Sequence, residues 1–178
     1  MGLHGLVRRT ALAAGATVLL ASGSAQAFTG VGVGDPVGGV LSSLDISVNS
    51  FARCSFASLS GTIATDAGAG SGGTISVSSL TLSSCTAGSV VTANALPSTI
   101  SIDGAGNLSW PGMDLTGRNG SVVCAYRGTP TGSYNQLNGV FALTGGPLTR
   151  YSGIAICGAT TTISGSFMLS SGGAPITL

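Results

Sequence analysis

The sequence predicts an all-β fold: an antiparallel β-sandwich, or a partly closed barrel, of about 8–10 short strands with two disulfides. Three observations support this. Apolar residues recur at every second position in short bursts, the first formed by Leu44, Ile46 and Val48, and a period of two is typical of strands. Runs of glycine, serine and aspartate, which favour turns, separate the bursts. No window after residue 27 has the apolar spacing of a helical face.

Residues 1–27 have the features of an export signal. Arg8 and Arg9 supply a positively charged n-region, an apolar run follows, and Ala25-Gln26-Ala27 forms a small-x-small cleavage site. The apolar run is shorter than the roughly 20 residues that a bilayer requires, so we expect cleavage before Phe28 and no transmembrane segment afterwards. The arginine pair leaves the Sec and twin-arginine routes both open. We expect a secreted protein that is extracellular or loosely attached to the cell surface.

Residues 28–43 are expected to form a flexible arm rich in glycine and valine. The glycines and Pro36 weaken any strand in this segment. The alternation of Val31 and Val33 leaves an alternative, in which the segment pairs with the open sheet edge of a neighbouring molecule. Residues 44–178 are expected to form a single all-β domain, because a chain of this length can bury roughly two-thirds of its unfolded surface.

Four cysteines lie in two similar segments. Cys54-Ser-Phe56 is followed by Gly61-Thr62 and by Cys85, and Cys124-Ala-Tyr126 is followed by Gly132-Ser133 and by Cys157. Three pairings are possible. We favour Cys54 with Cys85 and Cys124 with Cys157, because each bridge would close one repeat-like unit. Export to an oxidising space favours disulfides, and each would stabilise the fold by roughly 3–4 kcal/mol on the chain-entropy model.

Further bursts and turns complete the pattern. Phase slips after Phe56 and after Val77 predict β-bulges. The turn at residues 103–107 lies between the bursts at 100–102 and 108–110 and predicts a hairpin. Other turns are expected at residues 66–73 and 145–147, and the later bursts lie at residues 122–126, 141–143 and 161–169.

Composition excludes most chemistry. After residue 27 the chain has five aspartates and four arginines, and it has no lysine, glutamate or histidine, since the single histidine is His4. Hydrolases of the usual serine or cysteine type need a histidine or lysine base. The cysteines are too far apart for structural zinc, and four scattered arginines do not form a nucleic-acid-binding stripe. We therefore expect no catalytic residue, cofactor, metal or nucleic-acid partner.

Aspartates and aromatic residues are the remaining candidates. Asp66 and Asp103 lie beside glycines and are expected in turns, whereas the setting of Asp114 is ambiguous. A glycosidase with two aspartates is the one enzyme class left open. Trp110, Tyr126 and Tyr151 are possible ligand or surface contacts, and the alternative for each is a packing role.

One family has a similar order of motifs. In chain order the sequence contains Cys54, Cys85, Ala93-Asn94-Ala95-Leu96-Pro97, Ile100, Cys124, Gly132-Ser133, Cys157 and Ser164-Gly165. Over residues 48–178 this order resembles the alkane oxidation protein activator (PraB) family. The resemblance implies a small secreted or surface-associated protein linked to biofilm matrix and to growth on hydrophobic substrates, without enzymatic activity. It brings no catalytic residue, and residues 28–43 are not part of it.

Two functions follow as hypotheses. The first is a structural or adhesive exoprotein of the cell surface or biofilm matrix that contacts hydrophobic surfaces or matrix components and can self-associate. Low charge and hydroxyl-rich strands favour it. The second is a disulfide-braced carrier that binds a small apolar ligand or a carbohydrate in a cleft.

Overall fold

The computed structural model describes residues 28–41, 45–48, 52–68, 71–86, 88–135 and 137–177, which form fourteen strands. The export signal predicted at residues 1–27 lies outside the described residues. In chain order the elements are β1 (Pro36–Leu41), β2 (Asp45–Val48), β3 (Ala52–Asp66), β4 (Gly72–Cys85), β5 (Ser89–Ala93), β6 (Ser98–Asp103), β7 (Asn107–Ser109), β8 (Met113–Asn119), β9 (Val122–Gly128), β10 (Thr131–Asn135), β11 (Val140–Gly145), β12 (Leu148–Ser152), the 3-10 turn η1 (Ala155–Cys157), β13 (Thr160–Ser171) and β14 (Ala174–Pro175).

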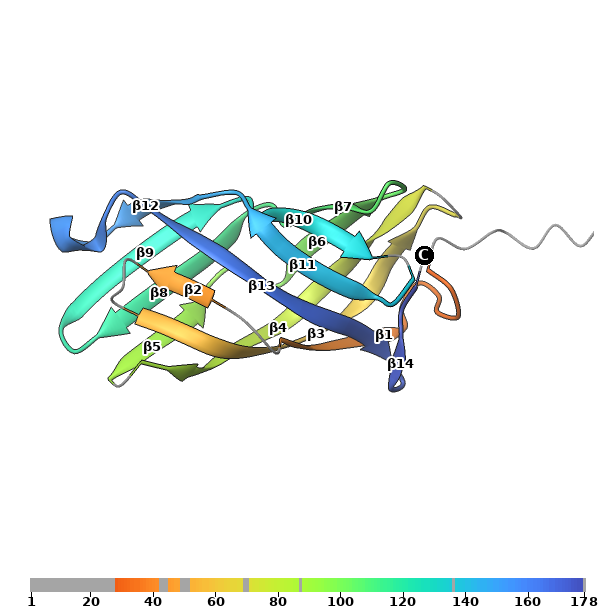
Figure 1. Ribbon diagram of the computed structural model, residues 1–178, viewed down its shortest axis with the longest axis horizontal. Helices are drawn as coiled ribbons and strands as arrows, with labels where there is room; N and C mark the ends of the chain where they lie inside the picture. Colours follow the sequence, from red (N-terminus) through yellow and green to blue (C-terminus); the bar gives the residue numbers. More distant parts are fainter. Residues whose placement is uncertain are drawn as a thin grey trace, which may run out of the picture.

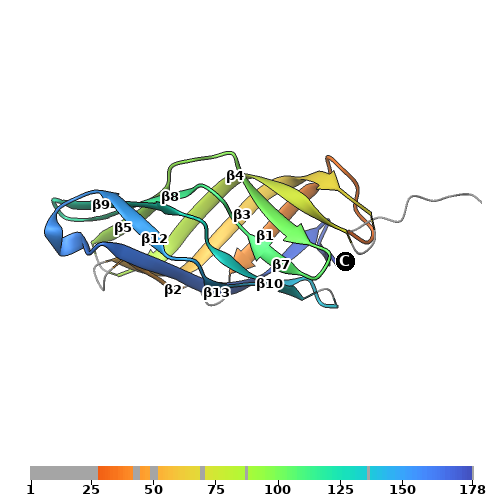
Figure 2. The ribbon, with the colours of Figure 1, turned by 90° about the horizontal axis from the view of Figure 1, so that it is seen from above.

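Eight strands form a closed antiparallel ring in the order β1, β3, β4, β6, β7, β10, β11 and β13. Pairing of β13 with β1, from Gly38 opposite Ser170 to Leu41 opposite Phe167, closes it. Figures 1 and 2 show an elongated barrel. The predicted all-β antiparallel fold with two disulfides is confirmed. The sheet closes into the barrel, which was the alternative to the expected sandwich, and it has fourteen strands where 8–10 were expected. Bulges bend long strands and so favour closure.

The long strand β13 belongs to two parts of the sheet. Its second half pairs with β11 and β1, and its first half pairs with β12 and β2. From β12 the sheet continues through β9 and β8 to β5. Figure 1 shows β13 running diagonally along the molecule, from the η1 end to the end that carries β1 and β14. The strand therefore joins the two ends of the barrel.

Large apolar side chains fill the interior. Trp110, Tyr126, Phe28 and Phe141 are among the largest fully buried residues. The rings of Phe141 and Phe167, which lie opposite each other on β11 and β13, have centroids 4.0 Å apart. A gap of about 10 Å³ lies among Trp110 and its neighbours in the core, which is room for about one water molecule.

The expected flexible arm is wrong for residues 28–41. Phe28 is 0% exposed and Val37 is 2% exposed, and β1 pairs with β3 on one side and β13 on the other. Pro36 is the first residue of the strand, a position that proline tolerates. The lack of a side chain at Gly39 lets Leu169 and Phe167 pack close to the backbone. The segment thus completes the barrel of its own chain, while residues 42 and 43 lie outside the described residues.

Two β-bulges occur opposite the glycines of the repeated Gly-Thr and Gly-Ser pairs. The register of β3 and β4 shifts between Ser60 and Gly61, and that of β10 and β11 shifts between Thr131 and Gly132. A Cβ atom at Gly61 would lie 2.1 Å from the carbonyl oxygen of Ser76. The phase slip predicted after Val77 corresponds to the first of these bulges, whereas the one predicted after Phe56 is wrong, because the register of β3 and β4 is unbroken from Phe56 to Ser60.

Both predicted disulfides are confirmed. Cys54 and Cys85 lie directly opposite each other on β3 and β4, whereas Cys124 of β9 is bonded to Cys157 of η1. The two segments do not fold as matching units, because the first bridge joins adjacent strands and the second fastens a loop. Two disulfides suggest an oxidising, non-cytoplasmic environment. Within the described ranges, no helix has the length and apolar character needed to cross a membrane.

Candidate functional site

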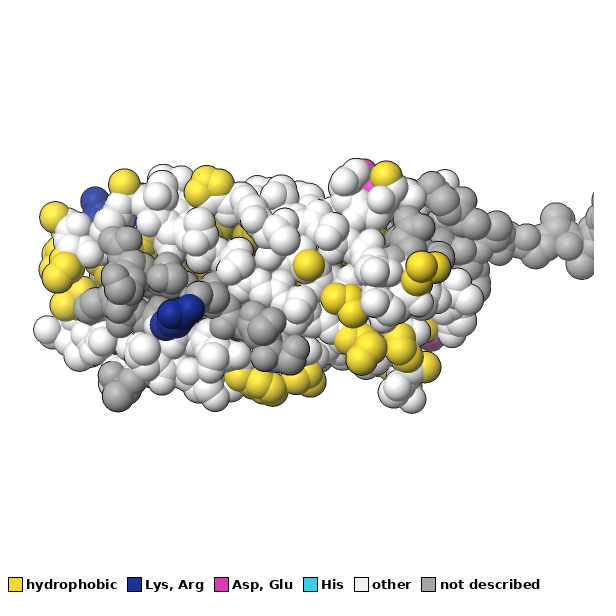
Figure 3. Space-filling view, in the orientation of Figure 1, with side chains coloured by type: hydrophobic (Ala, Val, Ile, Leu, Met, Phe, Trp, Pro, Cys, Tyr) yellow, Lys and Arg dark blue, Asp and Glu magenta, His cyan; other side chains and the backbone are white. Residues whose placement is uncertain are grey.

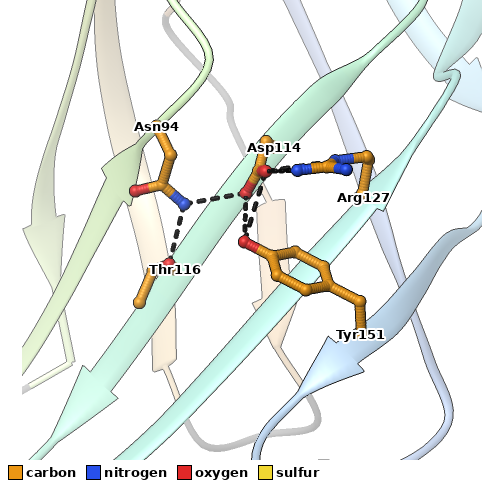
Figure 4. Close-up of polar contacts among 5 residues, drawn as sticks. All are labelled: Asn94, Asp114, Thr116, Arg127 and Tyr151. Atoms are coloured by element: carbon orange, nitrogen blue, oxygen red, sulfur yellow. Dashed lines mark hydrogen bonds and ion pairs between the residues drawn. The ribbon is translucent and has the colours of Figure 1, made fainter.

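A polar cluster surrounds Asp114 on β8 and draws side chains from neighbouring segments of the sheet (Figure 4). On β8 the side chains of Met113 and Leu115 are buried in the core, so the strand alternation directs Asp114 to the outer face. Asp114 is nevertheless only 4% exposed. Asn94, Arg127 and Tyr151 surround its carboxylate and shield it from water.

Asp114 accepts hydrogen bonds from three side chains. Arg127 donates from Nη2 at 2.6 Å and from Nε at 3.1 Å, both to Oδ2. The Tyr151 hydroxyl donates to Oδ1 at 2.9 Å, and Asn94 Nδ2 donates to the same oxygen at 2.8 Å. The guanidinium of Arg127 also lies 4.9 Å from the centroid of the Tyr151 ring. Both carboxylate oxygens are therefore fully used within the cluster.

Sheet register brings these side chains together from four segments. Asp114 and Arg127 are direct partners on β8 and β9. Tyr151 lies at the register shift between Arg150 and Ser152, where β12 passes β9. Asn94 directly follows β5, and its backbone N–H donates to the Asp114 carbonyl at 2.9 Å. The cluster thus ties the sheet from β5 to β12 on its outer face.

The electrostatics favour fixed charges over proton transfer. Burial raises the pKa of Asp114, but hydrogen bonds from Asn94, Arg127 and Tyr151 and the charge of Arg127 outweigh it, so that the pKa lies below its ordinary value. The hydrogen bond to Asp114 raises the pKa of Arg127 and of Tyr151. At neutral pH the pair is ionised, which suits a structural clamp and does not suit a general acid.

Replacing Asp114 by asparagine is expected to lower the free energy of unfolding at pH 7 by about 1 kcal/mol, because water screens the pair at an Arg127 side chain that is 61% exposed. The effect should depend on pH. Since the pKa of Asp114 is lowered from 3.8, its stabilisation is complete above about pH 4 and is lost as pH falls through the folded-state pKa.

Urea unfolding of wild type and Asp114→Asn between pH 7 and pH 2 tests this prediction. The difference between the two proteins should shrink below pH 4. Asp103, whose pKa is lowered by its hydrogen bonds with Asn107, is present in both proteins and does not affect the difference. A difference that stays constant with pH would contradict the assignment.

The structure separates the three aromatic candidates. Trp110 is 2% exposed, with its indole N–H donating to Ser98 Oγ at 2.9 Å, and Tyr126 is 0% exposed. Their predicted role as surface contacts is therefore wrong, because both side chains face the barrel interior. Tyr151 is 53% exposed and lies in the Asp114 cluster. Only this aromatic candidate is accessible from outside.

Asp66 and Asp103 stabilise turns, as the sequence predicts. Asp103 Oδ1 accepts from the N–H groups of Ala105 and Asn107, and Asp66 Oδ1 accepts from Gly68 N–H. Neither Asp103 nor Asp114 has the raised pKa that the acid of a glycosidase requires. Within the part of the chain that the structure describes, no three His, Cys, Asp or Glu side chains gather where they could hold a metal ion.

An apolar groove lies on the outer face of the barrel, and sequence patterns did not point to it. We call it the side groove: a hollow of about 410 Å³ lined by Gly38, Val40, Ser58, Met168, Ser170 and Pro175, among others. Val40 is 55% exposed and Met168 is 48% exposed, and they lie opposite each other on β1 and β13. Figure 3 shows apolar side chains gathered where β1, β13 and β14 meet. The expected arm contained Val40, so this pairing was not foreseen.

A second hollow adjoins the side groove. It has a volume of about 290 Å³ and is lined by Val40, Val140 and Met168 together with two residues of β13. Val140 lies opposite Met168 on β11. One line of apolar side chains, of which Val40 and Met168 are exposed and Val140 is half-buried, therefore crosses three strands.

Comparison with protein-family models, with curated proteins and with solved structures gave no significant match to this chain.

Proposed function

We propose that the protein is a secreted, non-enzymatic exoprotein of the cell surface or biofilm matrix that contacts hydrophobic surfaces. The observation that carries this proposal is the apolar line of Val40, Met168 and Val140 across the outer face of the barrel. Contiguous apolar patches on a protein surface often mark binding sites. The PraB-like order of motifs supports the same function.

Low charge strengthens the proposal. Residues 28–178 contain nine charged side chains, five aspartates and four arginines. Of these, Asp114 and Arg127 neutralise each other in one ion pair. Hydroxyl groups, glycine backbone and scattered apolar side chains must then supply most of the exterior. Few charged groups need to lose their hydration when such an exterior meets oil or plastic, while each Å² of apolar surface removed from water contributes about 25 cal/mol.

The double substitution Val40→Ser with Met168→Ser is expected to weaken adsorption to polystyrene and to hexadecane droplets by about tenfold, because the most exposed part of the apolar line is lost. Adsorption isotherms of the purified protein at low concentration provide the measurement. Val33→Ser is the matched control, since Val33 is 65% exposed and does not line the groove.

Deletion of the protein from the producing cells is expected to lower their adhesion to the same materials. Equal adsorption by the double variant and wild type, together with unchanged adhesion after deletion, would refute the proposal. Reduced adsorption by the Val33 variant alone would place the contact elsewhere on the molecule.

A carrier of a small apolar ligand is the second candidate, and the size of the side groove favours it. About 410 Å³ lies within the range of small-molecule sites. The core gap of about 10 Å³ has no room for such a ligand, so it would bind on the outer face. Native mass spectrometry of the secreted protein distinguishes the candidates: a stoichiometric small molecule that is lost with Val40→Ser and Met168→Ser would favour the carrier.

A further inference from the structure

A short apolar loop occupies one end of the barrel. We call residues 151–158, which comprise the end of β12, η1 and the residues around it, the tip loop. Ile154 is 60% exposed, Ile156 is 63% exposed and Tyr151 is 53% exposed. Figures 1 and 2 place η1 at one extreme of the long axis, and Figure 3 shows apolar side chains gathered at that end. Two large aliphatic side chains are thus presented on a protruding surface.

The tip loop is held in one conformation. Cys157, which is 0% exposed, bonds it to Cys124 of β9. The carbonyl oxygen of Ile154 accepts from Cys157 N–H at 3.0 Å and from Arg150 Nη1 at 2.6 Å, and Gly158 N–H donates to the carbonyl oxygen of Ala155 at 3.1 Å. These backbone groups have hydrogen-bond partners in the loop itself or in Arg150 of β12. Burying these groups in an apolar site would cost no hydrogen bond to water, and the bridge reduces the conformational entropy that the loop would lose on binding.

The side groove lies toward the opposite end of the same barrel. β13 begins at Thr160, just after the tip loop, and reaches Met168 and Ser170 of the groove eight to ten residues later, a distance of roughly 26–33 Å along a strand. A loop and a groove this far apart on one rigid barrel cannot meet within the same molecule. They can meet between two molecules.

Charges at the two ends have opposite signs. Arg150 contacts the tip loop, and Arg118 lies opposite Val123, next to the bridged Cys124. Asp66 and Asp103 lie opposite Gly73 and Gly72 at the far end of β4. Asp35 lies at the same end, where its carbonyl oxygen accepts from Ile63 N–H, and it immediately precedes β1 of the groove. Asp35 is the aspartate nearest in sequence to the groove strand β1, and its charge is opposite in sign to that of Arg150 at the tip.

We propose that the tip loop of one molecule inserts Ile154 and Ile156 into the side groove of a second copy, so that the protein assembles head to tail. A heterologous contact of this kind leaves a free tip and a free groove at every stage, and it therefore extends into a linear fibre unless the rotation closes a ring. The partner is a second copy of this chain. The proposal rests on the proposed function insofar as a fibre is a structural element of a matrix.

Complementary variants test the contact. Ile154→Ser with Ile156→Ser removes the tip, and Val40→Lys blocks the groove and adds a positive charge opposite the tip arginines. Sedimentation velocity and electron microscopy of the purified, disulfide-intact protein should show concentration-dependent linear assemblies for wild type and monomers for either variant. An equimolar mixture of the two variants should form dimers and nothing larger, because one intact tip meets one intact groove.

Leu137→Ser is the matched control. Leu137 is 92% exposed in the turn between β10 and β11, and this variant should assemble like wild type. A monomeric wild type, undiminished assembly of the tip variant, or a mixture that stays monomeric would each overturn the proposal. So would a tip variant that assembles normally but loses binding to phosphatidylcholine–phosphatidylglycerol vesicles, because the loop would then be a lipid contact. Wild type that adsorbs to polystyrene yet stays monomeric would leave the proposed function standing and refute only the assembly.

Discussion

Replacing Gly132 by alanine is expected to lower the free energy of unfolding by about 3 kcal/mol or more, because the barrel leaves no space for a side chain there. A Cβ atom at Gly132 would lie 1.9 Å from the carbonyl oxygen of Ala142 and 3.0 Å from the Cα atom of Leu143. Both are backbone atoms of the neighbouring strand in a closed ring, so neither can turn aside as a side chain would. Equilibrium urea unfolding of the purified variant provides the measurement.

Gly38→Ala is the matched control within the same ring. Its Cβ would face outward, with the nearest atom 4.0 Å away, so we expect a change within about 0.5 kcal/mol. Gly61→Ala should behave like Gly132→Ala, since its Cβ would lie 2.1 Å from the carbonyl oxygen of Ser76. Equal effects of the Gly38 and Gly132 substitutions would show that the bulges relax freely, contrary to this account.

The two glycines show how far sequence reasoning reaches. Gly61-Thr62 and Gly132-Ser133 stand out as an echo between two segments, and the phase slip of the apolar pattern after Val77 predicts the bulge near the first of them. Local pattern was enough for this, as it was for the strands and the turn at Asp103. The reason for glycine at these positions lies in the partner strands, which come 15 and 10 residues later in the chain, at Ser76 and Ala142. That reason becomes visible only when the register is known.

Closure of the barrel depends on contacts that no local pattern encodes. Ser170 of β13 donates to Gly38 of β1 across 132 positions of sequence. An arm was predicted for this segment because glycine and proline weaken a strand. In residues 28–41, pairing on both edges of β1 and the burial of Phe28 outweigh that weakness. The side groove could not be predicted from the sequence either, because Val40 joins it only when β1 pairs with β13.

For the candidate site, too, the sequence identifies individual residues, whereas their contacts depend on how distant strands pair. The ambiguous setting of Asp114 and the list of three aromatic residues came from sequence, but alternation alone does not say which face of a strand is inside. Tyr126 shares the buried face with Cys124, whereas Tyr151 lies at a register shift that turns it outward. Bringing Arg127 and Tyr151 to Asp114 required the register of β8, β9 and β12.

Replacing Cys124 and Cys157 together by alanine is expected to lower the free energy of unfolding by about 3–4 kcal/mol, the chain-entropy value for a bridge that closes 33 residues. Alanine is preferred to serine because both cysteines are 0% exposed, and a hydroxyl group would be buried there without an assured partner. Chemical unfolding of the variant and of wild type measures the loss.

The same variant should lose head-to-tail assembly while it is still folded. Without the bridge, the tip loop loses its covalent tie to β9, and ordering it again in the groove lowers affinity. Cys54→Ala with Cys85→Ala is the control. It removes a bridge over 31 residues, so its loss of stability should be similar, but extensive pairing still holds β3 to β4 and the tip is untouched. Assembly lost with the second bridge and retained without the first would assign the Cys124–Cys157 disulfide to the tip, whereas equal losses of assembly would mean that stability alone governs association.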